Sequence, residues 1–246
     1  MIFQKNPFTV RGRLRRCWLF VYRTPAVAAR ALLPRPLNLV TRDGFAFWNI
    51  VVCQIGALRP AGWPAAVGLG YWHVAYRLHV RAQPQDGAPV EGLWFLRSDC
   101  DSALVAAGGN LVTDFCFHHA TIEVAETDRT VAGKITAHGG DAQFHLNRKT
   151  TPQLAAGSPF ASVEEAAAYL KYKPFGISPS GPEAVNVVRV VREEAAWRSR
   201  LVAVEDARWQ FLARHETALE ICYEVEPIDY QWERGKILRV ASCASS

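Results

Sequence analysis

The sequence predicts an α+β fold that is mainly antiparallel β, with a sheet or barrel flanked by a few short helices. Three observations favour this class: strand-like segments outnumber helical ones, short turns join many of them, and no repeat, low-complexity tract or linker divides the chain. The chain has 246 residues, of which 50% are hydrophobic and 21% charged, so it can bury a substantial core. We therefore expect one domain over residues 1–246.

The first strand is expected at residues 14–23, "LRRCWLFVYR", which are rich in aromatic and β-branched residues. A short helix is expected at 24–34, because Thr24 is a good N-cap and Pro25 suits the first helical position. Residues 44–55, "GFAFWNIVVCQI", are apolar at both odd and even positions. This pattern predicts a strand that is covered on both faces.

Residues 56–70 are punctuated by Gly and Pro and predict a loop. Residues 71–80 and 90–98 predict the two strands of a hairpin, with a turn at Asp86 and Gly87. Further strands are expected from β-rich composition at 120–126, 130–137, 142–148, 184–191, 197–205 and 217–232.

Two more helices are expected. Residues 101–107 predict a short helix that Gly108 and Gly109 end, with Ser102 near its start. Residues 162–173 predict the clearest helix, because Ser162 and Glu165 have the spacing of a capping box and Pro174 follows.

Overall composition excludes several classes of protein. The net charge is +5, but the basic residues are spread along the chain without interleaved stacking aromatics, so no nucleic-acid partner is expected. The apolar run "CWLFVY" is too short for a signal-peptide core or a membrane span, so we expect a cytoplasmic protein with no membrane partner. The six cysteines are widely spaced without a CxxC pair and are read as buried, reduced thiols.

Strand alternation sorts the polar candidates by face. In residues 71–80 the even positions are apolar, whereas the odd positions include His73, so the odd face meets either water or a polar cavity. In "NLVTDFCFHHATIEV", His118 shares a face with apolar residues and His119 does not. Adjacent residues on a strand point apart, so this pair does not converge on one metal ion. No metal site is expected, although His118 with a distant partner such as His73 is the alternative. Asn49, within an apolar strand, is either a satisfied structural amide or a pocket residue.

Several motifs in register resemble the acetoacetate decarboxylase superfamily. They are "LFVYRTPAVAARALLPRPLNLV", "FWNIVV", "GLGYWHV", "LRSDCDSALVAAGGN" and "FCFHHATI", which cover residues 11–149 in the family's order. Within the superfamily the chain looks like the YqjF-like branch, a domain-of-unknown-function family. The resemblance implies an acetoacetate decarboxylase-like β-barrel with a cavity, flanking short helices and, commonly, assembly into an oligomer, so a homo-oligomer is a possible partner state.

The resemblance also implies that the active-site chemistry has changed. The decarboxylases hold a cavity lysine that forms an imine and a second lysine that lowers its pKa. These positions fall at or next to His118 and His119, and no lysine occurs between Lys5 and Lys134. The family's two pocket glutamates match Asn49 and His73. An arginine that pairs with the substrate carboxylate matches Arg15. A Schiff-base decarboxylase is therefore not expected, and no cofactor is expected.

Three functions remain open from the sequence. The first is a small-molecule-binding protein whose pocket takes a small carbonyl or carboxylate compound, with Asn49, Arg15, Trp48, Trp72 and Tyr76 as binding residues. The second is an acid/base enzyme, such as a lyase, dehydratase, isomerase or cyclase, with His118 and His73 as catalytic residues. The third is a structural, oligomer-forming module whose aromatic residues fill the cavity.

Overall fold

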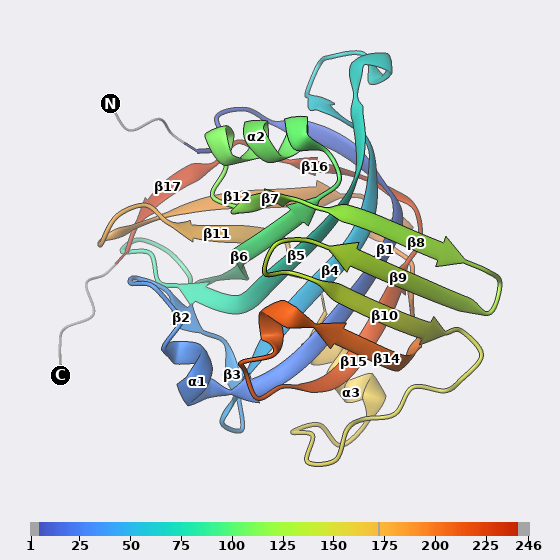
Figure 1. Cartoon of the computed structure of the whole chain (residues 1–246). Helices are drawn as coiled ribbons and strands as arrows, with labels where there is room; N and C mark the ends of the chain where they lie inside the picture. Colours follow the sequence, from blue (N-terminus) through green and yellow to red (C-terminus); the bar gives the residue numbers. More distant parts are fainter. Residues whose placement is uncertain (1–4, 172, 241–246) are drawn as a thin grey trace.

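Seven strands of one large sheet close into a barrel in the structure, which is a computed structural model that describes residues 5–171 and 173–240 (Figure 1). The barrel runs β1-β16-β12-β11-β6-β5-β4 and returns to β1 through the β1–β4 pair. Its strands are β1 (Val10–Pro25), β4 (Phe45–Pro60), β5 (Leu69–Ala82), β6 (Val90–Cys100), β11 (Phe175–Pro179), β12 (Ala184–Arg192) and β16 (Ile228–Trp232). Neighbouring strands of the barrel are antiparallel, except β11 and β6, which are parallel.

Short strands extend the barrel sheet at its margins. β15 (Ala218–Val225) pairs with the second half of β1 and carries β13 (Ser199–Leu201). The other marginal strands are β2 (Asn38–Leu39) on β5, β3 (Thr41–Arg42) on β4, β7 (Phe117–His119) on β6 and β17 (Lys236–Arg239) on β12.

A second, four-stranded sheet packs on the outside of the barrel. Its order is β14 (Ala203–Trp209), β10 (Ala142–Asn147), β9 (Thr130–Thr136) and β8 (Thr121–Glu126). The inter-sheet core between it and the barrel includes Trp18, Phe20, Trp48, Tyr76 and Phe144. These rings are close-packed: the centroid of Phe20 lies 5.2 Å from that of Phe144 and 5.0 Å from that of Trp209.

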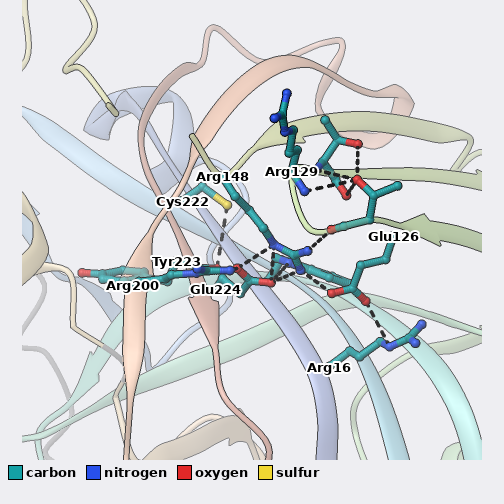
Figure 2. A network of polar contacts seen from close by, with 11 residues as sticks. Arg16, Glu126, Arg129, Arg148, Arg200, Cys222, Tyr223 and Glu224 are labelled. Atoms are coloured by element: carbon teal, nitrogen blue, oxygen red, sulfur yellow. Dashed lines mark hydrogen bonds and ion pairs between the residues drawn. The ribbon is translucent and has the colours of Figure 1, made fainter. Parts of the chain in front are cut away.

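An ionic network fastens the second sheet to the barrel at one edge (Figure 2). Arg148, just after β10, donates from Nε to both carboxylate oxygens of Glu224 on β15, each at 3.1 Å, and its Nη2 also binds Glu126 at the end of β8. Arg16 on β1 reaches the other oxygen of Glu126 at 3.2 Å, and Arg200 binds Glu224 at 2.8 Å. Strands β1, β8, β13 and β15 and the residue that follows β10 are thus joined by charge-assisted hydrogen bonds and ion pairs.

Within the described residues, three short helices and three 3₁₀ turns lie between the strands. They are α1 (Ala26–Arg30), α2 (Ala103–Val112) and α3 (Val163–Tyr169), with 3₁₀ turns η1 (Ala65–Val67), η2 (Glu194–Ala196) and η3 (Gln210–Leu212). Figure 1 shows α2 lying across one end of the barrel. Ser162 caps α3 by accepting from Glu165 N at 3.1 Å, and Ser102 caps α2 by accepting from Val105 N at 3.3 Å. No described helix is both long and apolar enough to cross a membrane.

The predicted fold class is confirmed, and several element predictions need correction. Thr24 is not a helix cap: β1 continues through Pro25, and Pro25 precedes α1 without a capping side chain. Gly108 and Gly109 do not end α2, which continues to Val112.

The expected loop at 56–70 is strand as far as Pro60, because the long β1 pairs with it along its full length. The expected strand 197–205 is divided into β13 and β14, which belong to different sheets. In the expected helix 162–173, residue 172 lies outside the described residues, and α3 ends at Tyr169.

Candidate functional site: the barrel cavity

The barrel encloses a cavity of about 460 Å³ that opens beneath α2. Most of its lining is apolar and comes from β1, β4, β5, β16 and the buried side of α2, with Leu14, Leu19, Val51, Ile55 and Val105 as examples. The polar groups are few. The polar and charged lining residues are Asn6, Arg59, Tyr71, His73, Arg77, Thr113, Arg192, Tyr230 and Glu233. An apolar hollow with a small number of polar groups is the usual form of a small-molecule site.

Strand β5 supplies the polar wall of the cavity. Its odd-numbered side chains Tyr71, His73 and Arg77 line the cavity, whereas its even-numbered side chains belong to the inter-sheet core. This separation follows from strand alternation, since one face of β5 points into the barrel and the other outward. The odd face of residues 71–80 therefore meets a cavity and not bulk water, which was one of the two alternatives that the sequence left open.

His73 is a neutral imidazole in the cavity wall. Its side chain is buried and lies on the ring of Phe117, with 5.3 Å between centroids, and its Nε2 has no hydrogen-bond partner. Burial, helped by the nearby Arg77 cation, lowers the pKa of His73 from its usual value to about 3. At neutral pH the ring thus offers hydrogen bonding without positive charge.

Arg77 places a cation deeper in the same wall. It is only 4% exposed, and its guanidinium donates to the side-chain oxygen of Asn49 and, at 3.4 Å, to the Asn49 carbonyl. The guanidinium also lies 5.4 Å from the centre of the Phe95 ring. Arg77 is not among the sequence-predicted site residues. The signal that could have identified it is a charged residue at an odd position of β5, two residues from one histidine and four from another.

Asn49 therefore lies behind the cavity wall, where it accepts hydrogen bonds from Arg77. It is 1% exposed and pairs with Arg77 in the β4–β5 register, but it does not itself line the cavity. A second arginine, Arg192, lines the cavity and stacks on Trp197, with 3.6 Å from its guanidinium carbon to the ring centre.

His118 lies outside the cavity, so the structure does not bring it together with His73. On the short strand β7, Phe117 points into the cavity and is buried, whereas His118 is exposed and pairs in register with Asp99 of β6. The residue that occupies this part of the cavity wall is thus the aromatic ring of Phe117. Among the described residues that line the cavity, none is a lysine.

The other predicted binding residues lie elsewhere. Trp48, Trp72 and Tyr76 are on the outward faces of β4 and β5 and pack in or against the inter-sheet core. Trp72, for example, stacks on Trp18 with their planes 8° apart. Arg15 is exposed and its side chain lies across Gly56, so it does not line the cavity.

The described residues contain no group of three or more His, Cys, Asp or Glu that could hold a metal ion. Cys17, Cys53, Cys100 and Cys222 are free, buried thiols, as predicted, whereas Cys116 is free but exposed, contrary to the prediction; Cys243 lies outside the described residues.

Solved structures with the same fold are acetoacetate decarboxylase-like. An acetoacetate decarboxylase-like enzyme from Sphingomonas wittichii RW1 has a TM-score of 0.58 and 17% identity over 97% of this chain and 95% of that one. Acetoacetate decarboxylase from Legionella pneumophila has a TM-score of 0.57 and 14% identity over 92% and 86%. The enduracididine biosynthesis enzyme MppR, in complex with a condensation product of pyruvate, has a TM-score of 0.61 and 12% identity over 95% and 90%.

At these identities the likeness shows the fold and not the activity. No curated protein matches the chain. One family profile does: DUF2071, described as an uncharacterized conserved protein, matches residues 11–230, which is most of the chain. The chain belongs to the DUF2071 family and has the acetoacetate decarboxylase-like fold.

Proposed function

We propose that the barrel cavity binds a small compound with an apolar body and one carboxylate or carbonyl group, which Arg77 and His73 hold. The observation that carries the proposal is the presence of a guanidinium and an unpartnered, neutral imidazole nitrogen in one otherwise largely apolar cavity. A carboxylate matches the charge of Arg77, and either a carboxylate or a carbonyl oxygen can accept from an imidazole N–H.

The cavity volume supports a ligand of modest size. About 460 Å³ lies within the range of roughly 300–1,000 Å³ that is typical of small-molecule sites. Leu69 and Tyr71 lie toward the start of β5, and Arg77 lies six residues beyond Tyr71 on the same strand. A bound amphiphile would therefore place its oxygen atoms at Arg77 and its apolar end toward Leu104 of α2.

Binding is favoured over acid/base catalysis by the state of His73. A general acid or base is most effective when its pKa lies near the working pH. A histidine whose pKa is about 3 is a weak base and is almost never protonated at neutral pH. The second histidine of an acid/base pair, His118, does not line the cavity.

Imine chemistry has no support from the lining, because none of the described lining residues has a primary amine side chain. A solved relative of the same fold is described as complexed with pyruvate, a small keto acid. The proposed ligand class includes small carboxylates of this kind, bound without formation of an imine.

Calorimetric titration with a series of carboxylates from propionate to octanoate, each paired with its primary alcohol, tests the proposal. We expect the carboxylates to bind and the affinity to grow with chain length as apolar surface enters the cavity. Arg77→Met should weaken carboxylate binding by about 10- to 100-fold and alcohol binding much less, since a hydrogen bond to a charged group contributes about 1.5–3 kcal/mol.

The matched control is Arg81→Met on the same strand, because Arg81 is exposed and pairs with Glu91 on the surface. A second variant, Val51→Phe, reduces the volume of the cavity while retaining Arg77 and should abolish binding of carboxylates and alcohols alike. Equal carboxylate affinity in Arg77→Met and Arg81→Met would contradict the proposed role of Arg77. Conversion of a bound compound, detected by NMR of the ligand, would instead identify an enzyme.

A further inference from the structure

Three cysteines and one histidine form a row across four neighbouring barrel strands. Cys17 faces Cys53 across β1 and β4, Cys53 faces His73 across β4 and β5, and His73 faces Cys100 across β5 and β6. Residues that face each other in an antiparallel pair have Cβ atoms about 4.5–5.5 Å apart and point to the same side. Cys17, Cys53 and His73 all line the cavity, whereas the Cys100 thiol donates to the Ser102 carbonyl at 3.3 Å.

The Cys17 and Cys53 thiols are directly opposed and reduced. Each residue is 3% exposed, and neither is in a disulfide. Burial raises the pKa of both thiols, to about 12 for Cys53, while the Arg77 cation acts in the opposite direction on both. Arg192 also favours the charged form of Cys17. Both thiols are therefore protonated in the absence of a metal ion, and the Arg77 and Arg192 guanidiniums lie near the pair. The thiols can ionise when a metal ion displaces their protons.

The number and type of ligands select the metal class. Because the described residues provide no group of three or more metal-ligating side chains, a tetrahedral zinc site is not available here. Two opposed thiolates suit a soft monovalent ion that accepts two sulfur ligands, and Cu(I) is the monovalent ion among the metals that thiolates select. His73 is independent evidence that something binds at this part of the cavity wall. It is 93% buried and faces Cys53 in the β4–β5 pair, yet its Nε2 has no hydrogen-bond partner.

We propose that Cys17 and Cys53 bind one Cu(I) ion as a buried bis-thiolate in the wall of the barrel cavity. Two S–H bonds are broken and two Cu–S bonds form: Cu⁺ and two thiols give [Cu(SR)₂]⁻ and two protons, with no change in oxidation state. The complex carries one negative charge, which Arg77 and Arg192 offset. This proposal does not depend on the small-molecule ligand, but it predicts that Cu(I) and a carboxylate compete for the positive potential of Arg77.

Anaerobic Cu(I) titration in competition with the chelator bathocuproine disulfonate tests the site. The starting chain carries Cys116→Ser and Cys243→Ser, which removes the exposed thiol and the thiol that lies outside the described residues. We expect one Cu(I) per chain and a two-sulfur environment by X-ray absorption. Affinity should rise by about 100-fold per pH unit below the pKa of the thiols, because two protons leave.

Cys17→Ala and Cys53→Ala should each lower Cu(I) affinity by on the order of 100-fold or more, since even outer-shell substitutions at metal sites cost 10- to 100-fold. The control is Cys222→Ala, which removes a buried thiol of the inter-sheet core. Circular dichroism establishes that each variant folds. Should one fail to fold, Cys17→Ser or Cys53→Ser replaces it, and proton release in the unsubstituted chain gives a second readout. Unchanged affinity in both the Cys17 and Cys53 variants, an equal loss in the Cys222 variant, or formation of a disulfide without retained copper would each overturn the proposal.

Discussion

Strand β5 separates two interiors that differ in how completely side chains fill them. Its even-numbered side chains, among them Val74, Tyr76 and Leu78, are fully buried in the inter-sheet core. Its odd-numbered side chains face the barrel, where a cavity of about 460 Å³ remains. One strand thus contributes to a packed core on one side and to a cavity on the other.

Side-chain volume explains the difference. The inter-sheet core is filled with large rings, and Tyr76 lies 4.8 Å from Phe211 between ring centroids. Several side chains of the barrel wall, including Cys17, Cys53 and Ala75, are small, and they leave space between the larger residues of the barrel interior. The predicted binding residues Trp48, Trp72 and Tyr76 therefore lie in or against the filled interior. The cavity is bordered by a different set of rings, which includes Phe95, Phe117 and Tyr230.

The largest effect is expected when one aromatic ring is truncated in each interior. Phe20→Ala should lower the free energy of unfolding by about 3–5 kcal/mol, because Phe20 is fully enclosed between Phe144 and Trp209. Phe115→Ala should cost clearly less, because Phe115 is only partly buried and already borders the cavity. Urea denaturation measures both values. Equal losses would show that the barrel interior is packed as tightly as the inter-sheet core.

The next test loosens the attachment of the second sheet. Arg148→Met should cost about 2–4 kcal/mol, because breaking a mostly buried ion pair leaves the Glu224 and Glu126 carboxylates without their shared partner. The matched control is Arg208→Met, since the Arg208 side chain is 76% exposed and its pair with Asp206 should contribute little. Carboxylate binding in the cavity should survive Arg148→Met at temperatures where the variant stays folded. Loss of binding in the folded variant would mean that the two interiors are not independent.

Much of the barrel could be predicted from local pattern alone. Strands 71–80, 90–98 and 142–148 were recognised because alternation and β-branched or aromatic composition are local signals. Strand β11 was missed, since its "FGISP" lies in a segment rich in Gly and Pro and is held by pairing with β12 and β6. Such pairing depends on distant residues and leaves no periodic signal in the segment itself.

The site was only partly predictable for a related reason. Alternation placed His73 on a face that could line a cavity, and the structure puts it there. His118 was assigned to the same face as Ala120 and Ile122, but the chain leaves the barrel sheet after β7 and enters the second sheet at β8. His118 and Ile122 therefore belong to two different sheets, and side-chain alternation within one strand does not relate their orientations. Trp48 was assigned to the wrong face for a different reason. Its strand is apolar on both faces, so the sequence does not reveal which face borders the cavity.

A smaller effect should appear in the pH dependence of stability. The pKa of His73 is lowered to about 3 in the folded protein by burial and Arg77, whereas the unfolded value is about 6.5. The unfolded chain therefore binds more protons between these values, and the folded state loses stability as pH falls from about 6.5 toward 3.

His73→Phe retains a ring against Phe117 and removes this proton uptake, so its stability relative to the unsubstituted protein should rise by about 1–2 kcal/mol between pH 7 and pH 5. Urea midpoints at the two pH values measure the change. A stability difference that stays constant from pH 7 to pH 5 would show that His73 titrates normally in the folded state, which would in turn restore it as a candidate acid or base.

The smallest test compares two adjacent glycines in α2, which covers the cavity. A Cβ at Gly108 would meet no atom within 4 Å, whereas a Cβ at Gly109 would lie 2.5 Å from the Phe117 ring. Gly108→Ala should therefore stabilise the protein by about 0.5–1 kcal/mol, because alanine restricts the unfolded chain and suits a helix interior. Gly109→Ala should destabilise it, since the helix must move away from the cavity wall or Phe117 must shift against His73. Thermal unfolding of the two variants gives the sign directly: stabilisation by both would mean that α2 is not seated on the barrel, and that the cavity is more open than its lining indicates.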